Sequence, residues 1–357
     1  MADVVQEAPD PLQPPKPKFG KQQIIASILT LIVLVIVFVV VLPQFGDYSA
    51  AWEAIQNMTA WQLGLIAAAT VGLIILYVFP YSAAMPGLRF KDGFYTRQTS
   101  FMISNVIPGG GAWGLAVQYG MLSSYGYGPA PTTAVIGITS VWNTLVTLSL
   151  PLLAIIGLTI TGQTGAEDVA ITVVAAILVV LMVGGLALIL RSEALARRIG
   201  GWGNAVVRWG AGIIHKEVSF DAAEALVDFR VSIIDVVADR WILITAANVG
   251  QQLAQFSILY LAVVALQGGF DGPITLAEAF AAFALGRLAT FIPIPPGGLG
   301  TTDAIITSML AGFGMSQDDA LAATLVWRAF TYFPQVIIGV ITLLLWRHDS
   351  AKKALSS

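Results

Sequence analysis

The segment over residues 275–314 constrains the fold more than any other part of the sequence. Two apolar stretches, residues 276–291 and 302–313, flank the run Pro-Ile-Pro-Pro-Gly-Gly-Leu-Gly that begins at Pro293. A helix needs roughly 20 residues to cross about 30 Å of hydrocarbon, so neither stretch is long enough to span a bilayer. The prolines remove backbone donors and the glycines allow positive φ, so the chain turns between the stretches. Irregular backbone at membrane depth persists only where protein or a water-filled cavity covers it, and we therefore predict a re-entrant hairpin that lines a site.

The composition is typical of a helical membrane protein. Hydrophobic residues make up 57% of the 357 residues and charged residues only 11%, and the mean hydropathy is +0.80. An average soluble domain has about 25% charged residues. The net charge of −3 does not favour nucleic-acid binding, and the absence of cysteine excludes disulfides and thiolate nucleophiles. We predict an all-α integral membrane protein and expect no cofactor.

Long uncharged segments predict about six transmembrane helices. The predicted spans cover residues 24–42, 61–79, 132–160, 169–190, 241–266 and 321–345. They belong to a polytopic membrane domain over residues 23–346, which lies between a disordered Pro-rich tail at 1–22 and a short tail at 347–357. The long charged connection at 191–240 predicts amphipathic helices that lie on the cytoplasmic membrane surface or against the bundle.

A second broken element is predicted at residues 99–125, where Pro108 and three glycines interrupt an uncharged segment. Basic connections alternate with acidic or neutral ones, which places both termini in the cytoplasm of a cell-membrane protein. Six spans are consistent with these loop positions only if the two broken elements are re-entrant hairpins of opposite orientation. Inverted broken helices are typical of transporters, and their breaks indicate the substrate site.

Three charges inside apolar segments are candidate substrate-binding residues, namely Arg287, Asp303 and Arg328. Each charge at a helix centre costs about 2.5 to 3.5 kcal/mol, so function is one reason to keep it. Their sum of +1 suits a lipid phosphate, which arginine can hold through paired hydrogen bonds. In the alternative interpretation, Arg328 and Asp303 form a structural pair and Arg287 reaches the outer interface.

Polar residues near the breaks and in the fifth predicted span are further candidates. Asn248 and Gln252 belong to a polar stripe with Gln251 and Gln255, whose alternative role is hydrogen bonding between helices. Asn143 and Gln335 have the same two interpretations. Candidates at the breaks, where a head group could approach the backbone and a helix N-terminus, are Gly297, Gly298, Gly300, Thr301 and Asn105.

The sequence also resembles the lysylphosphatidylglycerol synthase transmembrane family, the flippase part of the multiple peptide resistance factor. Residues 291–304, F-I-P-I-P-P-G-G-L-G-T-T-D-A, are similar to its P-x-P-G-G-x-G-x-x-E signature. Residues 327–334, W-R-A-F-T-Y-F-P, resemble its Y-R-x-x-T-Y-x-x-P stretch, and Asn105, Pro108 and Gly114 resemble its N-x-x-P…G element. In all, the resemblance covers most of residues 24–346.

Two departures from the family pattern bear on the substrate. Asp303 replaces the glutamate of the signature, and the polar G-E-x-x-R after the first break is replaced by G-L-A-V-Q at residues 114–118. The second departure leaves the substrate open. Because no soluble aminoacyl-transferase domain follows the last predicted span, the resemblance implies a stand-alone translocase rather than a synthase.

We therefore expect a lipid translocase that moves or binds a polar head group, with transport favoured over catalysis. The expected partners are anionic or aminoacylated phospholipids or a lipid-linked sugar, with no nucleic acid; a homo-oligomer is compatible with the sequence. One alternative is an intramembrane lipid-modifying transferase with Asp303 as base. Another is a non-transporting accessory subunit of a cell-envelope glycolipid synthase. His215 and His348 have no partner at ligand spacing, so no metal site is expected.

Overall fold

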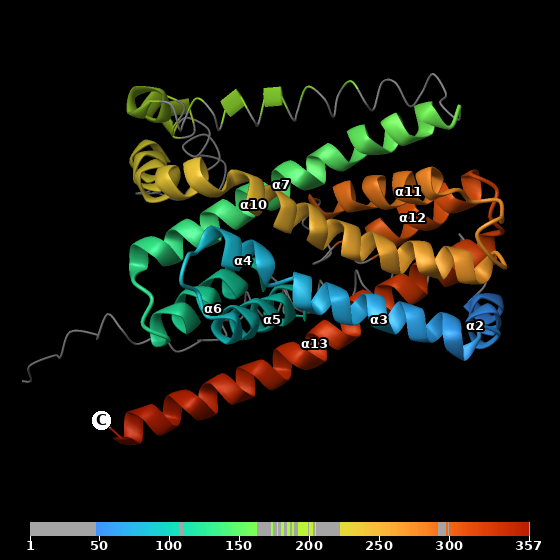
Figure 1. Ribbon diagram of the computed structural model, residues 1–357, viewed down its shortest axis with the longest axis horizontal. Coiled ribbons are helices and arrows are strands. Elements are labelled where there is room, and N and C mark those ends of the chain that lie inside the picture. Colours follow the sequence, from blue (N-terminus) through green and yellow to red (C-terminus); the bar gives the residue numbers. More distant parts are fainter. Residues whose placement is uncertain are drawn as a thin grey trace, which may run out of the picture.

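The computed structural model of the chain is an elongated bundle of helices (Figure 1). It describes residues 48–106, 110–162, 222–291, 298 and 300–356, with short stretches and isolated positions between 173 and 204. Within these residues the chain is helical and contains no strand, which confirms the all-α prediction. The helices are α2 (Tyr48–Gln56), α3 (Ala60–Leu76), α4 (Phe79–Ala84), α5 (Phe90–Val106), α6 (Gly110–Ser124), α7 (Pro129–Ile160), α10 (Ala222–Leu266), α11 (Leu276–Leu288), the 3-10 turn η3 (Ala289–Phe291), α12 (Thr301–Gly312) and α13 (Gln317–Ser356).

Four helical segments of the described chain are long and apolar enough to cross a membrane. They cover Ala60–Ala84, Pro129–Ile160, Ile233–Leu266 and Gln317–Ser350. Each contains or overlaps a predicted span, at 61–79, 132–160, 241–266 and 321–345. The predicted span at 24–42, most of the one at 169–190 and the Pro-rich tail fall outside the described residues, so the number six stays a prediction.

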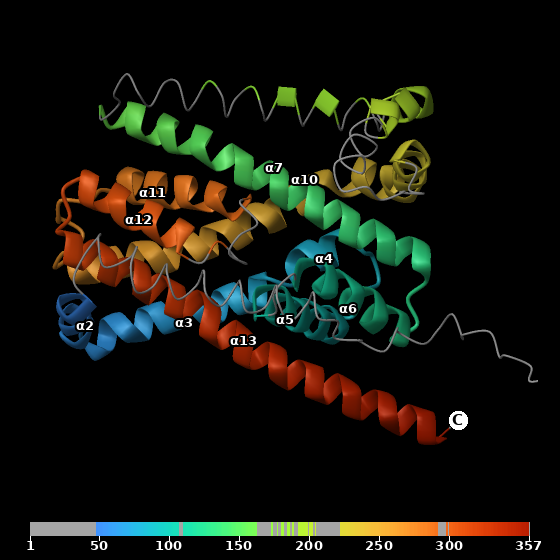
Figure 2. The ribbon, with the colours of Figure 1, turned by 180° about the vertical axis from the view of Figure 1, so that it is seen from behind.

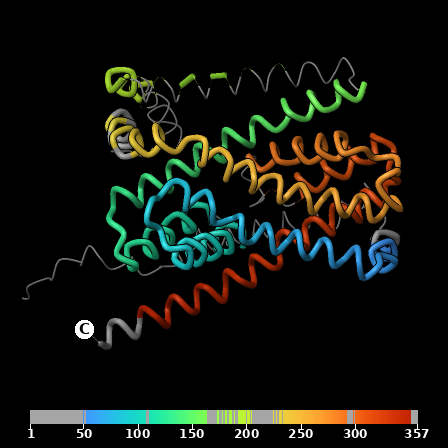
Figure 3. Tube along the Cα trace, viewed as in Figure 1, coloured from blue at the N-terminus to red at the C-terminus, as the bar shows by residue number. Residues whose placement is uncertain are grey.

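Helix α10 joins two elements that the sequence suggested were separate. It continues without a break from Ala222 through the charged positions Asp235 and Asp239 to Leu266, roughly 65 Å in all. Both aspartates are exposed, whereas Ile233 on the same part of the helix is fully buried. The amphipathic part therefore packs against the bundle, and its charges face away from it. Figure 3 shows the trace of α10 running along the long axis of the molecule.

Two pairs of short helices lie at opposite ends of this bundle in both ribbon views (Figures 1 and 2). In one pair α11 packs against α12, with the break over residues 292–299 between them. In the other pair α5 packs against α6, and the break falls at residues 107–109. The predicted start of the first pair at residue 99 was wrong, because α5 already begins at Phe90. Its early polar residues, among them Asp92 and Gln98, are buried against protein, and hydrogen bonds to Tyr127 and to the Ile74 backbone oxygen offset part of the cost of burying them.

The apolar core consists of two main clusters. The larger one joins α3, α10, α11, α12 and α13 around Phe283 and Trp327, whose rings meet edge to face at 6.2 Å. The other one joins α4, the start of α7 and the first half of α10 around Tyr81 and Trp142. Neither cluster includes the polar face of α5, which packs mainly against α6 and α13. Polar side chains are thus concentrated between the clusters, where the cavity described below lies.

Candidate functional site

The described chain contains a partly open polar cavity of about 280 Å³ to which both helix pairs contribute. Asn105 comes from the end of α5, whereas Arg287, Thr290 and Thr302 come from the two sides of the α11–α12 break. The other walls come from α3, α4, α6, α7, α10 and α13. The remaining lining residues are Tyr77, Pro80, Arg97, Phe101, Gln118, Thr139, Ser140, Asn143, Asn248, Gln251, Gln255, Trp327, Arg328, Thr331, Tyr332 and Gln335.

Asp303 and Arg328 form a buried ion pair at the edge of this cavity. Arg328 Nε donates to Asp303 Oδ1 at 2.8 Å, and Nη2 lies 2.7 Å from the same oxygen without the geometry of a hydrogen bond. The other carboxylate oxygen accepts a hydrogen bond of 2.7 Å from the backbone N–H of Gly300, at the start of α12. Asp303 therefore fixes both the helix start and the arginine. This pairing agrees with the structural interpretation, although Arg328 also lines the cavity.

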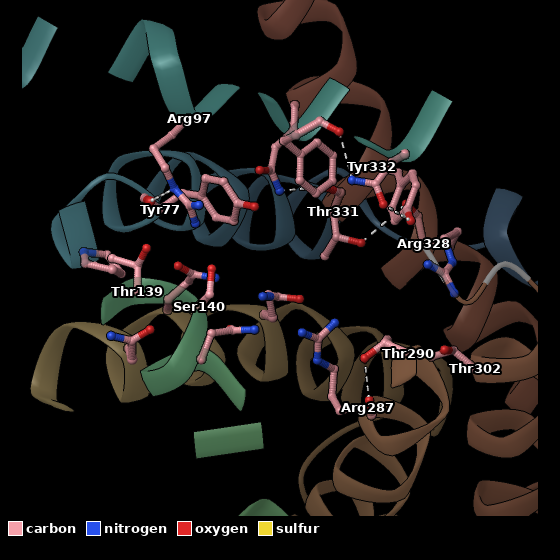
Figure 4. A pocket seen from close by; sticks show the side chains of 18 of the residues that line it. Tyr77, Arg97, Thr139, Ser140, Arg287, Thr290, Thr302, Arg328, Thr331 and Tyr332 are labelled. Atoms are coloured by element: carbon pink, nitrogen blue, oxygen red, sulfur yellow. Dashed lines mark hydrogen bonds between the residues drawn. The ribbon is translucent and has the colours of Figure 1, made fainter. Parts of the chain in front are cut away.

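Arg287 has a different environment from Arg328. It lies in the last turn of α11 and lines the cavity, and its Nε is buried without a hydrogen-bond partner in the described part of the chain. Its backbone oxygen accepts a hydrogen bond from Thr290 Oγ1 at 2.7 Å, which fixes the turn into the break. Figure 4 shows the Arg287 guanidinium among the cavity side chains. Arg287 is thus a charge-bearing donor that no described carboxylate pairs with.

Arg97 is a lining residue that the sequence analysis did not single out. It lies on α5, its Nε donates to the backbone oxygen of Tyr77 at 3.3 Å, and its guanidinium stacks over the rings of Tyr77 and Tyr81 at 4.2 and 4.8 Å. The signal was present in the polar run T-R-Q-T-S at residues 96–100, which is unusual directly before an apolar segment. A run of buried polar residues on a helix indicates a facing cavity or polar partner.

Gln118 occupies the position where the family signature has its arginine. Its Oε1 accepts a hydrogen bond from the hydroxyl of Tyr81, and its Nε2 donates to Ser100 Oγ at 2.6 Å. Leu115, at the position of the signature glutamate, is instead exposed on the outside of α6. This cavity wall therefore carries an amide at the position where the family pattern has an arginine.

The polar stripe on α10 divides between two roles. Asn248, Gln251 and Gln255 line the cavity. Gln252 does not, because its Nε2 donates across to Asn143 Oδ1 at 3.3 Å and to Thr147 Oγ1 at 3.1 Å on α7. The contacts of Gln252 match the helix-to-helix interpretation, and the structure does not bring it into the cavity lining with the other predicted residues.

The break residues mostly position the site rather than line it. Gly298 and Gly300 have φ of 64° and 84°, and both are buried outside the cavity lining. Thr301 also lies outside the lining, whereas its neighbour Thr302 lines the cavity with a buried Oγ1 that has no partner in the described chain. The prediction thus missed the lining threonine by one position. Gly297 falls outside the described residues.

Asn105 connects the two ends of the site. Its Oδ1 accepts a hydrogen bond from the Tyr332 hydroxyl at 2.9 Å, and its Nδ2 donates to the backbone oxygen of Phe101 at 2.8 Å. The Phe101 ring in turn meets Tyr77 and Tyr332 edge to face, at 5.6 and 5.4 Å. The predicted residues Asn105, Asn248, Arg287 and Arg328 are therefore brought together around one cavity, with Asp303 directly behind Arg328.

Comparison with known proteins places the chain among membrane proteins associated with lipid synthesis. The family model described as the lysylphosphatidylglycerol synthase TM region matches residues 23–339. A comparison with curated proteins found no match. The matched region contains every residue that lines the cavity.

Proposed function

The chain belongs to the lysylphosphatidylglycerol synthase TM region family, and from this premise we propose that its polar cavity binds the head group of a membrane lipid and carries it across the bilayer. The family and the four candidate membrane-spanning helices establish a multi-pass membrane protein with a lipid-related role. Translocation of the lipid across the bilayer is our proposal and goes beyond this lipid-related role. The lipid tails would remain in the hydrocarbon while the head group moves through the cavity.

The observation that carries this proposal is the excess positive charge of the cavity. Arg97, Arg287 and Arg328 line it, and only Asp303 pairs with one of them, which leaves two positive charges from the described residues. An unpaired guanidinium in a low-dielectric site is costly, so a ligand with negative charge is its natural partner. A phosphate fits, because arginine can hold two of its oxygens in a planar fork.

The helix pairs supply a route for such a head group. We propose that α5–α6 and α11–α12 are re-entrant hairpins entering from opposite sides of the membrane, with both termini in the cytoplasm. Their ends reach the same cavity from opposite ends of the bundle, which is the arrangement that alternating access requires. Movement of one pair relative to the other would open the cavity to one leaflet at a time.

A transferase mechanism has less support from the site. It would need a free general base, but Asp303 has one oxygen bound by Arg328 and the other by the Gly300 amide. No group of three or more acidic or histidine side chains that could hold a metal ion lies in the described part of the chain. The geometry therefore favours binding and transport.

The test is a leaflet-exchange assay with the full chain in liposomes of neutral phosphatidylcholine. Phosphatidylglycerol with a fluorophore on one acyl chain keeps its natural head group, and dithionite reduces only the label in the outer leaflet. We expect the protein to make the inner label reducible, and we expect Arg287→Gln to abolish this exchange. Leu344→Val, at an exposed apolar position on α13, is the control that should exchange normally.

Two results would contradict the proposal. A new lipid species on chromatography would indicate an enzyme. A folded protein that neither exchanges nor binds lipid would indicate an accessory subunit.

A further inference from the structure

We propose that the cavity selects head groups that carry a phosphate and hydroxyl groups but no amine. The inference rests on the proposed function and narrows its substrate class. It separates glycerol-phosphate lipids and sugar-phosphate lipids, which share this chemistry, from aminoacylated phospholipids, whose head group carries added positive charge.

The ionisable residues of the described lining are arginines and a few tyrosines. No aspartate, glutamate, lysine or histidine is among the described lining residues, and the carboxylate of Asp303 is already held by Arg328. An ammonium group entering the cavity would meet Arg97 and Arg287 without a carboxylate to offset the repulsion. Like charges placed together at a binding site exclude the wrong ligand even where its shape fits.

Amide side chains are the most numerous polar residues of the remaining lining. Seven of them line the cavity, namely Asn105, Gln118, Asn143, Asn248, Gln251, Gln255 and Gln335. An amide both donates and accepts hydrogen bonds and carries no charge, as does a hydroxyl group. Such a wall matches a polyol more closely than it matches a second ionic group.

Two of these amides have unused acceptors. Gln251 and Gln335 are only 5% and 2% exposed, and the Oε1 of each is buried without a partner in the described chain. Gln335 Nε2 donates to the backbone oxygen of Thr331 at 2.8 Å, which leaves its carbonyl as the free end. A buried acceptor without a donor is costly, and a ligand hydroxyl would satisfy it.

Figure 4 indicates how a head group would lie. Arg287 and Arg328 lie on the side of Thr290 and Thr302, whereas Arg97 lies with Tyr77 on the other side. A phosphate held by Arg287, beside the Asp303–Arg328 ion pair, would place the rest of the head group along the amide wall. The hydroxyl groups of the glycerol or sugar esterified to that phosphate could then donate to the unpartnered Oε1 atoms of Gln251 and Gln335, which line the same cavity.

The test is native mass spectrometry of the full chain in neutral detergent, with lipids in competition at equal concentration. The probes are phosphatidylglycerol, phosphatidic acid, lysyl-phosphatidylglycerol and a polyprenyl-phosphate sugar. We expect one or both of the hydroxyl-bearing anions to bind about tenfold more than phosphatidic acid and more than lysyl-phosphatidylglycerol. Which of the two binds better separates a glycerol-phosphate from a sugar-phosphate source.

Variants at two lining amides test whether these side chains cause the lipid selectivity. Gln251→Leu or Gln335→Leu should bring binding of the hydroxyl-bearing lipid close to that of phosphatidic acid while leaving phosphatidic acid bound. Gln252→Leu is the matched control on the same helix and should keep the preference, because Gln252 faces α7. Two results would overturn this inference but not the proposed function. One is equal or tighter binding of lysyl-phosphatidylglycerol, and the other is an unchanged preference for the hydroxyl-bearing lipid over phosphatidic acid in both cavity variants. Absence of any lipid binding by the wild-type chain would overturn the proposed function as well.

Discussion

The two helix pairs are built from opposite kinds of surface. In α11 the buried face consists largely of alanines with Phe283, and the pair packs into the larger apolar cluster. In α5 the buried residues include Asp92, Thr96, Gln98 and Thr99, and several contacts to neighbouring helices are polar. One such contact is the 2.8 Å hydrogen bond between Thr99 and Thr342 on α13. The apolar pair is docked by burial of apolar side chains, whereas the polar pair also relies on hydrogen bonds such as those of Gln98 and Thr99.

This difference assigns separate tasks to the two ends of the cavity. The α11–α12 pair brings Arg287 and, through Asp303, the orientation of Arg328. The α5–α6 pair brings Arg97, Asn105 and Gln118. The first end concentrates charge for an anion, and the second end combines one arginine with amides that suit the uncharged part of a head group.

Removing the ion pair at the α11–α12 end should have the largest effect. Arg328→Met leaves the Asp303 carboxylate buried without its cation, which costs about 3 to 5 kcal/mol of stability. The double variant Arg328→Met with Asp303→Leu should regain most of the stability, measured by thermal unfolding in detergent, but not lipid exchange. Recovery of both by the double variant would show that Arg328 serves only the fold.

The packing at α5 should tolerate added volume less well than the packing at α11. A Cβ at Gly339 of α13 would meet Met102 and lie 2.6 Å from the backbone oxygen of Gln98 on α5. A Cβ at Gly286 of α11 would lie 2.5 Å from Cγ1 of Ile306, a side-chain atom rather than backbone. Gly339→Ala should therefore cost about 1 to 3 kcal/mol, and Gly286→Ala less. Equal losses of unfolding free energy would remove this contrast between the pairs.

The connection after α6 is fixed to α5 by an acidic contact outside the candidate spans. The Tyr127 hydroxyl donates to Asp92 Oδ2 at 3.0 Å, and burial first and then the Asp92 carboxylate raise the pKa of Tyr127 above its ordinary value of 10.0. The neutral Tyr127 hydroxyl therefore contributes its full stabilisation of the fold below pH 10.0. This contribution is lost as the pH rises through the raised pKa of Tyr127 in the folded protein.

Tyr127→Phe tests this contact. It should cost about 1 kcal/mol at neutral pH, and the difference from wild type should shrink in strongly alkaline buffer. Unfolding curves measured across that range provide the check. A difference that does not change with pH would mean that the hydroxyl contributes nothing through its ionisation.

The smallest effect should come from Gln252. Gln252→Leu removes its hydrogen bonds to Asn143 and Thr147, worth about 0.6 kcal/mol each in a membrane bundle. Lipid exchange should stay at the wild-type rate, because the side chain does not line the cavity. If Gln252→Leu lost lipid exchange while its stability stayed unchanged, Gln252 would belong to the binding site.

The same contrast explains what the sequence could predict. Prolines and glycines within an apolar segment mark the α11–α12 break, and Arg287, Asp303 and Arg328 are conspicuous because few charges occur nearby. The start of α5 and its Arg97 were missed, because a helix buried by polar contacts has the composition of a loop. The continuation of α10 through Asp235 and Asp239 was missed for a related reason. Exposed charges lower the hydropathy of a helix without ending it.

The account's central claim is that an anionic head group occupies the cavity, and cysteine protection tests it most directly. The chain has no cysteine. Ser140 of α7 lines the cavity and Ser149 of the same helix does not, while both hydroxyls donate to the carbonyl four residues earlier, at 2.7 and 2.8 Å. Ser140→Cys and Ser149→Cys are therefore matched variants.

Both variants would be treated with a small anionic thiol reagent in phosphatidylcholine liposomes, with and without phosphatidylglycerol. We predict that phosphatidylglycerol slows modification at Ser140→Cys but not at Ser149→Cys, and that adding Arg287→Gln removes the protection. An inert cysteine at position 140, or rates at the two positions that respond equally to the lipid, would contradict a head group bound in this cavity.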